Sequence, residues 1–336
     1  MNKDKILVTG ITGFVGSHMA NFILKNHDDV EIHGTKRYHL SRLEKAQYIF
    51  DKVEWHDCDL TDYFAVEDLI DNIRPDKIFH FAAQSFVSPS WKHPTLYMDV
   101  NYNCTVNLLE ALKKIESKAF FLIPGSAEEY GELEEDQMPI NENSPLKPVN
   151  PYAVTKIAQD LIGHVYHKSY GLNVIRCRTF NHEGAGRENV FGISSYAYQI
   201  AKIEKDLQEP NILVGHLDDR RNFTHVKDVV RAYWMAIDKC IPGELYLIGN
   251  EDKDSIFSFK EALEKLKKMS TIPNISHSEH KPYVRPTAVP RLIANTSKFR
   301  EICDWKPEIT FDEILLDTLN YWRREIENKI AIGVYK

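Results

Sequence analysis

KILVTGITGFVG, residues 5–16, is the stretch that decides the fold of this chain. It opens with a short apolar run, which is typical of a strand buried on both faces of a sheet. Three glycines with GxxGxxG spacing follow, and residues 16–26 then carry a helical pattern. Glycines at such a turn let the backbone approach a pyrophosphate, and the N-terminus of the following helix offers free N–H groups to that anion. The stretch therefore predicts the strand, turn and helix that begin a dinucleotide-binding fold.

Short apolar runs and helical patterns continue to alternate through the first half of the chain, which predicts a parallel sheet covered by helices on both faces. The expected strands are 5–9, 30–34, 53–57, 77–81, 119–124 and 174–179, and the expected helices are 16–26, 63–73, 99–115 and 151–170. From about residue 180 the apolar runs are interrupted by loops rich in Asn, Arg, Gly and Pro. The pieces expected there are helices over 193–207, 226–239 and 258–269 and strands over 212–214 and 245–248.

These patterns predict an α/β protein with two lobes. Residues 1–180 should form a Rossmann-type, doubly wound parallel sheet, and residues 181–336 a smaller C-terminal α/β lobe for the substrate. Part of 222–245 should pack back on the first lobe.

Composition limits the possible functions. A length of 336 residues suits two lobes that share a cleft, and a net charge of −7 does not suit general nucleic-acid binding. No apolar run approaches the roughly 20 residues of a membrane span, and the apolar part of MNKDKILVTG is too short for a signal peptide. Five widely spaced cysteines predict free thiols and a cytoplasmic protein, and fourteen histidines without a ligand motif such as HExxH predict no metal site.

The end of the second expected strand indicates which dinucleotide binds. Its sequence, GTKR over 34–37, has no acidic residue to hold a ribose 2′-hydroxyl. The guanidinium of Arg37 suits a 2′-phosphate, so we expect NADP; the alternative is a solvated surface arginine. Asp59 and Leu60 follow the third strand, where they can meet the adenine. The small residues of FAA, 81–83, stand where the backbone passes close to the cofactor.

A catalytic set is expected at the carboxyl ends of the later strands. Tyr152 and Lys156 lie four residues apart on one face of a helix. A free phenol, with a pKa near 10, is a poor base at neutral pH, and a nearby ammonium favours the phenolate. Ser126 ends the fifth strand, where its hydroxyl can hold the substrate oxygen whose proton Tyr152 takes. YxxxK alone usually marks a helix surface, so the order of these residues after the glycine turn carries the prediction.

With these pieces the chain resembles the extended short-chain dehydrogenase/reductase superfamily over nearly its whole length. Within it, the chain is most similar to the GDP-mannose 4,6-dehydratases, with the GDP-6-deoxy-4-keto-mannose reductases close behind. The matching motifs are GITGFVGS (10–17), GTKR (34–37), FAAQSFV (81–87), GSAEEYG (125–131), NPYAVTK (150–156), RTFNHEG (178–184), RRNFTHVKD (220–228), VRPTAV (284–289) and WKPEIT (305–310).

The resemblance implies roles for individual residues. Ser126, Glu128, Tyr152 and Lys156 should be catalytic. The cofactor-binding residues should be Gly10, Thr12, Gly13, Phe14, Val15, Gly16, Arg37, Asp59, Leu60, Phe81, Ala82, Ala83, Ser85, Tyr152, Lys156, His182 and Arg187. The substrate-binding residues should be Ser85, Ser126, Asn181, Arg221 and Arg285, with the two arginines on the diphosphate.

Two departures from the family pattern concern the nucleotide. The NHEGAGREN loop, 181–189, lacks one arginine of the family loop, and Ala288 replaces a glutamate expected to contact the nucleotide ribose.

Glu128 distinguishes the candidate reactions. Oxidation or reduction at C4 needs only Ser126, Tyr152, Lys156 and the cofactor, whereas loss of water from C5–C6 also needs a base for the C5 proton and an acid at the C6 hydroxyl. We therefore expect a lyase that converts a GDP-mannose-like GDP-sugar to its 4-keto-6-deoxy form through transient hydride transfer to NADP. If Glu128 is only one carboxylate of an acidic loop, the alternative is an NADPH-dependent 4-keto reductase or epimerase.

A non-enzymatic dinucleotide sensor is a third reading, which the intact Ser–Tyr–Lys set opposes. The resemblance also implies a homodimer through a four-helix bundle of the helices 99–115 and 151–170, with a tetramer as the alternative.

Overall fold

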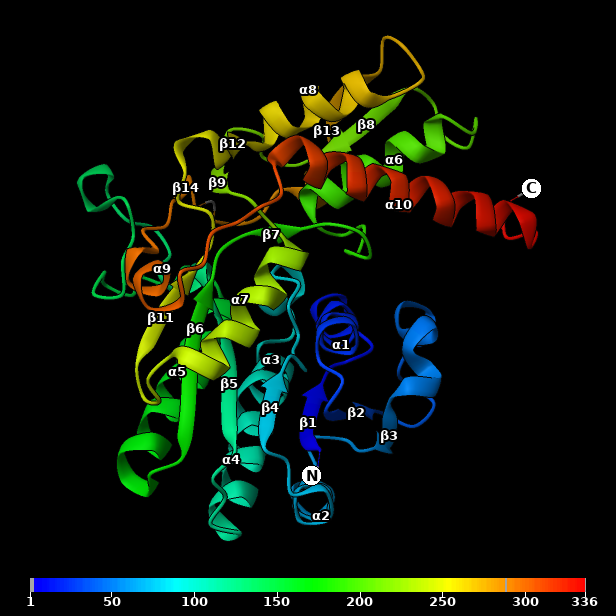
Figure 1. Ribbon diagram of the computed structural model, residues 1–336. Helices are drawn as coiled ribbons and strands as arrows, with labels where there is room; N and C mark the ends of the chain where they lie inside the picture. The colour runs from blue at the N-terminus through cyan, green and yellow to red at the C-terminus, as the bar shows by residue number, and fades with distance from the viewer. Residues whose placement is uncertain (1–2, 288, 336) are drawn as a thin grey trace.

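The computed structural model of the protein describes residues 3–287 and 289–335. Its centre is a seven-stranded sheet in the order β11-β6-β5-β4-β1-β2-β3, in which every neighbouring pair is parallel (Figure 1). The strands are β1 (Asp4–Thr9), β2 (Val30–Lys36), β3 (Glu54–Asp57), β4 (Lys77–His80), β5 (Phe120–Ser126), β6 (Asn173–Thr179) and β11 (Leu245–Ile248). The chain crosses from β3 over β1 to β4, so the expected doubly wound α/β fold is confirmed.

Helices cover both faces of this sheet. On one face α1 (Phe14–Asn26) and α7 (Val226–Lys239) contribute to a single apolar core with β1, β2 and β6. On the other face lie α2 (Tyr63–Ile73), α4 (Cys104–Lys114) and α5 (Pro151–Tyr170). The expected helix over 99–115 starts earlier, as α3 (Pro94–Met98), and passes through a wider π-type turn before α4.

The second lobe has its own core, formed by α6 (Gly192–Ile203), α8 (Phe259–Met269) and α10 (Phe311–Ala331), which Figure 1 shows above the sheet. Its short strands are β7 (His182–Glu183), β8 (Asn211–Val214), β9 (Arg220–Asn222), β10 (Thr224–His225), β12 (Ile256–Ser258), β13 (Ser276–Glu279) and β14 (Arg291–Leu292). Within the described residues, no helix has both the length and the apolar character needed to cross a membrane.

One strand lies elsewhere than expected. Residues 245–248 were assigned to the smaller lobe, but they form β11, which pairs with β6 and completes the main sheet. The local sequence predicts the strand β11, but it does not predict that this strand pairs with β6.

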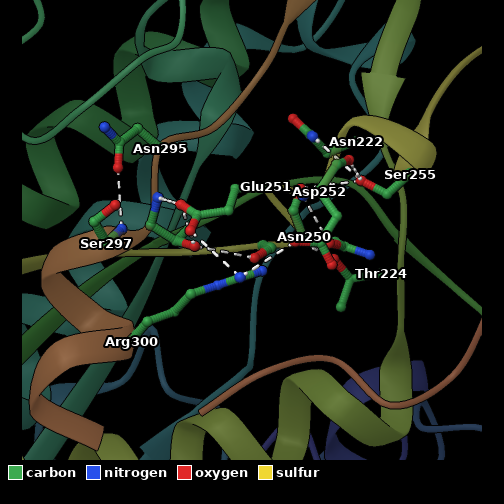
Figure 2. Close-up of polar contacts among 11 residues, drawn as sticks. Asn222, Thr224, Asn250, Glu251, Asp252, Ser255, Asn295, Ser297 and Arg300 are labelled. Carbon is green, nitrogen blue, oxygen red and sulfur yellow. Dashed lines mark hydrogen bonds and ion pairs between the residues drawn. The ribbon is translucent and has the colours of Figure 1, made fainter. Parts of the chain in front are cut away.

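Polar contacts then tie the loop after β11 to both lobes (Figure 2). Asn250 N donates to Thr224 Oγ1 (2.9 Å), at β10. Arg300 Nη1, in α9 (Ser297–Cys303), lies 3.3 Å from carboxylate oxygens of both Glu251 and Asp252. The loop after β11 therefore holds the two lobes together through polar contacts.

Candidate active site

The glycine turn after β1 forms a cradle with no room for side chains. Gly10 has a φ of +66°, and a Cβ added to it would lie 2.6 Å from Ala82 N. A Cβ on Gly16 would lie 2.3 Å from the carbonyl oxygen of Gly10. Both positions therefore require glycine, and the N-terminus of α1 opens onto a cavity of about 250 Å³ beside them. A backbone surface at a helix N-terminus is suited to the pyrophosphate of a dinucleotide.

Most residues expected at the site line this cavity. They are Gly10, Gly13, Phe14, Val15, Gly16, Phe81, Ala83, Ser85, Ser126, Glu128, Tyr152, Lys156, Asn181, His182, Arg187 and Arg285. They come from the ends of β1, β4 and β5, from α1 and α5, from the loop after β6 and from the segment before β14, so the fold brings together residues that are widely separated in sequence.

Several expected residues do not line the cavity. Thr12 lies within the glycine turn, and Ala82 contributes its backbone, which meets Gly10. The Leu60 side chain is buried in the core under α2 and α4, so only its backbone can reach a ligand. Asp59 and Arg37 are exposed at the ends of β3 and β2. Among the described residues, no carboxylate forms an ion pair with the Arg37 guanidinium. The adenine-side contacts remain predictions.

Tyr152 lies in the first turn of α5, which starts at a well-formed cap because Asn150 Oδ1 accepts from Ala153 N (2.8 Å). Burial raises the pKa of the Tyr152 phenol, while a hydrogen bond with Ser126 and the charge of Arg187 oppose that shift. The hydroxyl of Ser126 also accepts from Glu128 N (3.2 Å), which fixes the turn that follows β5. The tyrosine and serine are therefore in mutual contact at the carboxyl end of the sheet.

Lys156 is buried one turn further along α5. Its ammonium donates to Pro124 O (2.5 Å) and to Gln159 Oε1, not to the Tyr152 hydroxyl. Burial lowers the pKa of Lys156 to about 8, and the charge of Glu129 opposes this. The charges that shift the pKa of Tyr152 most are those of Glu128, Glu129 and Arg187, so the expected influence of the lysine on the tyrosine stays a prediction.

A buried charge network supports this set from behind, and it was not predicted from the sequence. Glu129, which the sequence shows only as one of several loop acids, is fully buried. Its carboxylate accepts from Ser126 N (2.7 Å) and lies 2.8 Å from Arg178 Nε. Arg178 and Arg176 both pair with Asp160 of α5. Burial raises the pKa of Glu129 to about 7, with the Asp160 charge adding to the shift.

Glu128 lies where the first cavity meets a second one of about 370 Å³. Glu128 Oε2 accepts from Asn150 Nδ2 (2.9 Å), and Oε1 lies 3.4 Å from Arg285 Nη1. Glu128, Asn181 and Arg285 line both cavities, so the two form one continuous cleft.

The second cavity is lined mainly by the second lobe, with Phe86, Ser88 and Glu128 on its other side, and it contains the other expected arginine. Arg221, on β9, is buried, and its Nη1 donates to Arg220 O (2.9 Å). Burial lowers the pKa of Arg221, and the charge of Glu128 opposes the shift. Lining residues that sequence reasoning missed include Tyr196, His216, Asp219, Phe259 and Tyr283. They lie in segments without a motif, so only the tertiary structure reveals them.

The loop after β6 closes the cofactor cavity with aromatic contacts. His182 stacks on Phe14, with ring centroids 6.0 Å apart and planes 3° apart. The Arg187 guanidinium lies 3.6 Å from the ring centre of Phe191, a lining residue absent from the prediction. Burial lowers the pKa of His182 to about 4, so the ring is neutral at pH 7. Ala288, the other departure from the family pattern, lies outside the described residues.

This arrangement is that of the extended short-chain dehydrogenases/reductases. A dinucleotide cradle opens into an arginine-bearing pocket, and a tyrosine and a lysine lie on the helix between them. Comparison with known families places the chain more narrowly. The family described as GDP-mannose 4,6 dehydratase matches residues 7–318, and the chain belongs to this family.

Individual relatives cover almost the whole chain. GDP-6-deoxy-D-mannose reductase from Pseudomonas aeruginosa is 28% identical over 97% of this chain and 99% of its own length. GDP-mannose 4,6-dehydratase from Yersinia enterocolitica is 31% identical over 92% of this chain and 91% of its own. The solved structure of RMD from P. aeruginosa complexed with NADPH has a TM-score of 0.82 at 28% identity, and covers 96% of this chain and 100% of that one.

Proposed function

We propose that this chain is a GDP-mannose 4,6-dehydratase-type lyase, which converts a GDP-mannose-like GDP-sugar to its 4-keto-6-deoxy form with NADP. The observation that carries the proposal is the position of Glu128, at the junction of the dinucleotide cavity and the arginine-bearing cavity. A carboxylate there adjoins the position of a sugar whose C4 faces Tyr152. When bound, NADP takes up a hydride from C4 and returns it at C6.

The protein's own groups move the protons. Ser126 holds the 4-hydroxyl oxygen, and Tyr152 takes its proton as C4 is oxidised. The resulting ketone acidifies the C5–H bond, so the carboxylate of Glu128 suffices as the base. The proton that Glu128 gains can then pass to the departing C6 hydroxyl, which leaves as water. The proton that Tyr152 took from the 4-hydroxyl can return to C5 when C6 is reduced. Asn150 and Arg285 orient Glu128 for both transfers.

Arginines at the two ends of the cleft can bind the cofactor and the nucleotide sugar. Arg37 is exposed at the end of β2, where its fork can hold a 2′-phosphate, and a relative of similar fold was solved with NADPH. Arg221 and Arg285 lie together at the second cavity, where they can hold the diphosphate of a GDP-sugar. We therefore infer NADP at the first cavity and the nucleotide sugar at the second.

Incubation of GDP-mannose with catalytic amounts of enzyme and NADP, without added reductant, tests this function. A dehydratase needs no net reductant, so mass spectrometry should show a product that has lost one water. A 4-keto reductase, suggested by the P. aeruginosa relative, would leave GDP-mannose unchanged and would consume NADPH with a 4-keto-6-deoxy GDP-sugar. That outcome would contradict the lyase proposal.

We also propose a homodimer. Three apolar side chains on one face of α5, Val154, Leu161 and Val165, are each nearly half exposed. Such a stripe fits a helix that packs against its copy in a four-helix bundle with α4. Leu161→Glu should convert a dimer to a monomer in light scattering; an unchanged mass would contradict this interface, and a larger assembly of the unmodified chain would indicate a tetramer.

All five cysteines are free and buried, which supports the cytoplasm as the compartment.

A further inference from the structure

A cluster of two histidines and a glutamate lies on β2 and β3, away from the residues that line either cavity of the cleft. His33 Nδ1 is 3.0 Å from His56 Nε2 and 3.5 Å from Glu54 Oε2. All three potential ligand atoms lie within 4.8 Å of one another. The register explains the cluster, because His33 pairs with Glu54 and Thr35 pairs with His56, so alternate residues of two parallel strands share one face. These three residues form no recognisable sequence motif, and no metal site was predicted from the sequence.

The spacing matches the ligand set of a tetrahedral cation. Zinc binds imidazole nitrogen and carboxylate oxygen at about 2.0–2.2 Å, which puts tetrahedral ligand atoms roughly 3.3–3.5 Å apart. The two distances from His33 Nδ1, 3.0 and 3.5 Å, lie close to that range. A hydrogen bond between the histidines accounts for the first distance, and strand register brings the carboxylate of Glu54 to the same nitrogen, so the fold itself places three ligand types together.

A second carboxylate, that of Glu31, lies at the other ring nitrogen of His33. His33 Nε2 lies 3.0 Å from Glu31 Oε1, so this nitrogen is the natural carrier of the ring proton. On the other side of the ring, His33 Nδ1 faces both His56 Nε2 and Glu54 Oε2, so a cation there would be in reach of all three atoms. Carboxylates commonly lie at the non-ligating nitrogen of a metal-bound histidine, and Glu31 occupies that position near His33.

We propose that His33, His56 and Glu54 form a zinc-type site for one divalent transition-metal ion, with water in the remaining position. Two imidazoles and a carboxylate favour zinc or its neighbours over Mg²⁺ or Ca²⁺. The ion would join β3 to β2, the outermost pair at one edge of the sheet, where Lys36 and Asp57 form an ion pair on the opposite face. Its role would be structural, and the proposal does not depend on the reaction catalysed in the cleft.

Calorimetric titration of Zn²⁺ into tag-free, chelator-treated full-length protein tests the site. His56→Gln and Glu54→Gln alter the more accessible ligands, whereas buried His33 is left in place to preserve folding. His93→Gln removes an exposed histidine outside the cluster and is the matched control. We expect one Zn²⁺ per chain in the unmodified and control proteins, and binding weakened by at least about tenfold in both ligand variants.

Two further measurements separate a metal site from a hydrogen-bonded histidine pair. Zn²⁺ should raise the melting temperature of the unmodified and control proteins but not of His56→Gln, because an ion that binds only the folded state stabilises it. Co²⁺ should give the visible absorption of a tetrahedral site in the same two proteins only. Equal Zn²⁺ binding by all four proteins, or no stoichiometric binding by the unmodified one, would overturn the proposal.

Discussion

Replacing Glu128 by glutamine removes a base while keeping the shape of the side chain. The amide can still accept from Asn150 through its oxygen, as the carboxylate does at 2.9 Å. The contact with Arg285 is long, at 3.4 Å, and that arginine is 34% exposed, so the pair contributes at most about 1 kcal/mol. The loss of this contact should raise the substrate KM by no more than about fivefold. Loss of the general base should slow elimination by about 10²–10⁴-fold.

A single-turnover experiment separates these effects. The first oxidation depends on Tyr152 and should survive in Glu128→Gln, so NADPH absorbance should accumulate together with a 4-keto sugar that has kept its water. Exchange of the C5 hydrogen with D₂O should fall in parallel. A variant that dehydrates GDP-mannose at nearly the original rate would refute the role of Glu128. Absence of C5 exchange in the unmodified enzyme would instead favour the reductase.

Three other predictions concern binding and pH. Arg37→Ala should weaken NADP binding by about 1.5–3 kcal/mol, measured by fluorescence titration, because a charge-assisted contact is lost; equal affinity of the unmodified protein for NAD and NADP would contradict this. Arg221→Gln should raise the substrate KM and leave the cofactor Kd nearly unchanged in steady-state and binding assays, and an unchanged KM would remove Arg221 from the substrate site. Burial lowers the pKa of His80 from 6.5 to about 3, so the stabilisation from its neutral form is present above pH 6.5 and is lost as the pH falls through 3. The free energy of unfolding should fall by about 1.4 kcal/mol per pH unit within that window. Urea unfolding at stepped pH should show a shallower dependence of this free energy on pH in His80→Gln. The same dependence in both proteins would contradict the role of His80.

The first lobe was predictable because each of its elements has a strong local pattern. The runs 5–9 and 174–179 are rich in Val, Ile and Leu and lie between turn signals, and the strands β1 and β6 extend them by only one residue. Helix α10 was not predicted, although Thr310 and Glu313 form a capping box at its start. The pairing of β11 with β6 could not be predicted, because a strand's own residues do not specify its neighbour.

The candidate site divides in the same way. The glycine turn, Tyr152 and Lys156 have fixed spacings that sequence reasoning can use. The burial of Glu129 against Arg178 depends on a strand more than forty residues later, and nothing local distinguishes this glutamate from the exposed acids around it. The proposed cation site depends on strand register in the same manner.

The position of β11 limits how this protein can be recombined with its relatives. A chimera joined at residue 180 would replace most of the second cavity, but it would also exchange the outermost strand beside β6 and the helix α7 that packs with α1. If the foreign strand fitted poorly, β6 would become an unpaired edge, and such edges promote association between chains. Substrate range is therefore better altered by grafting the loops and short strands around Arg221 and Arg285 than by swapping the second half of the chain.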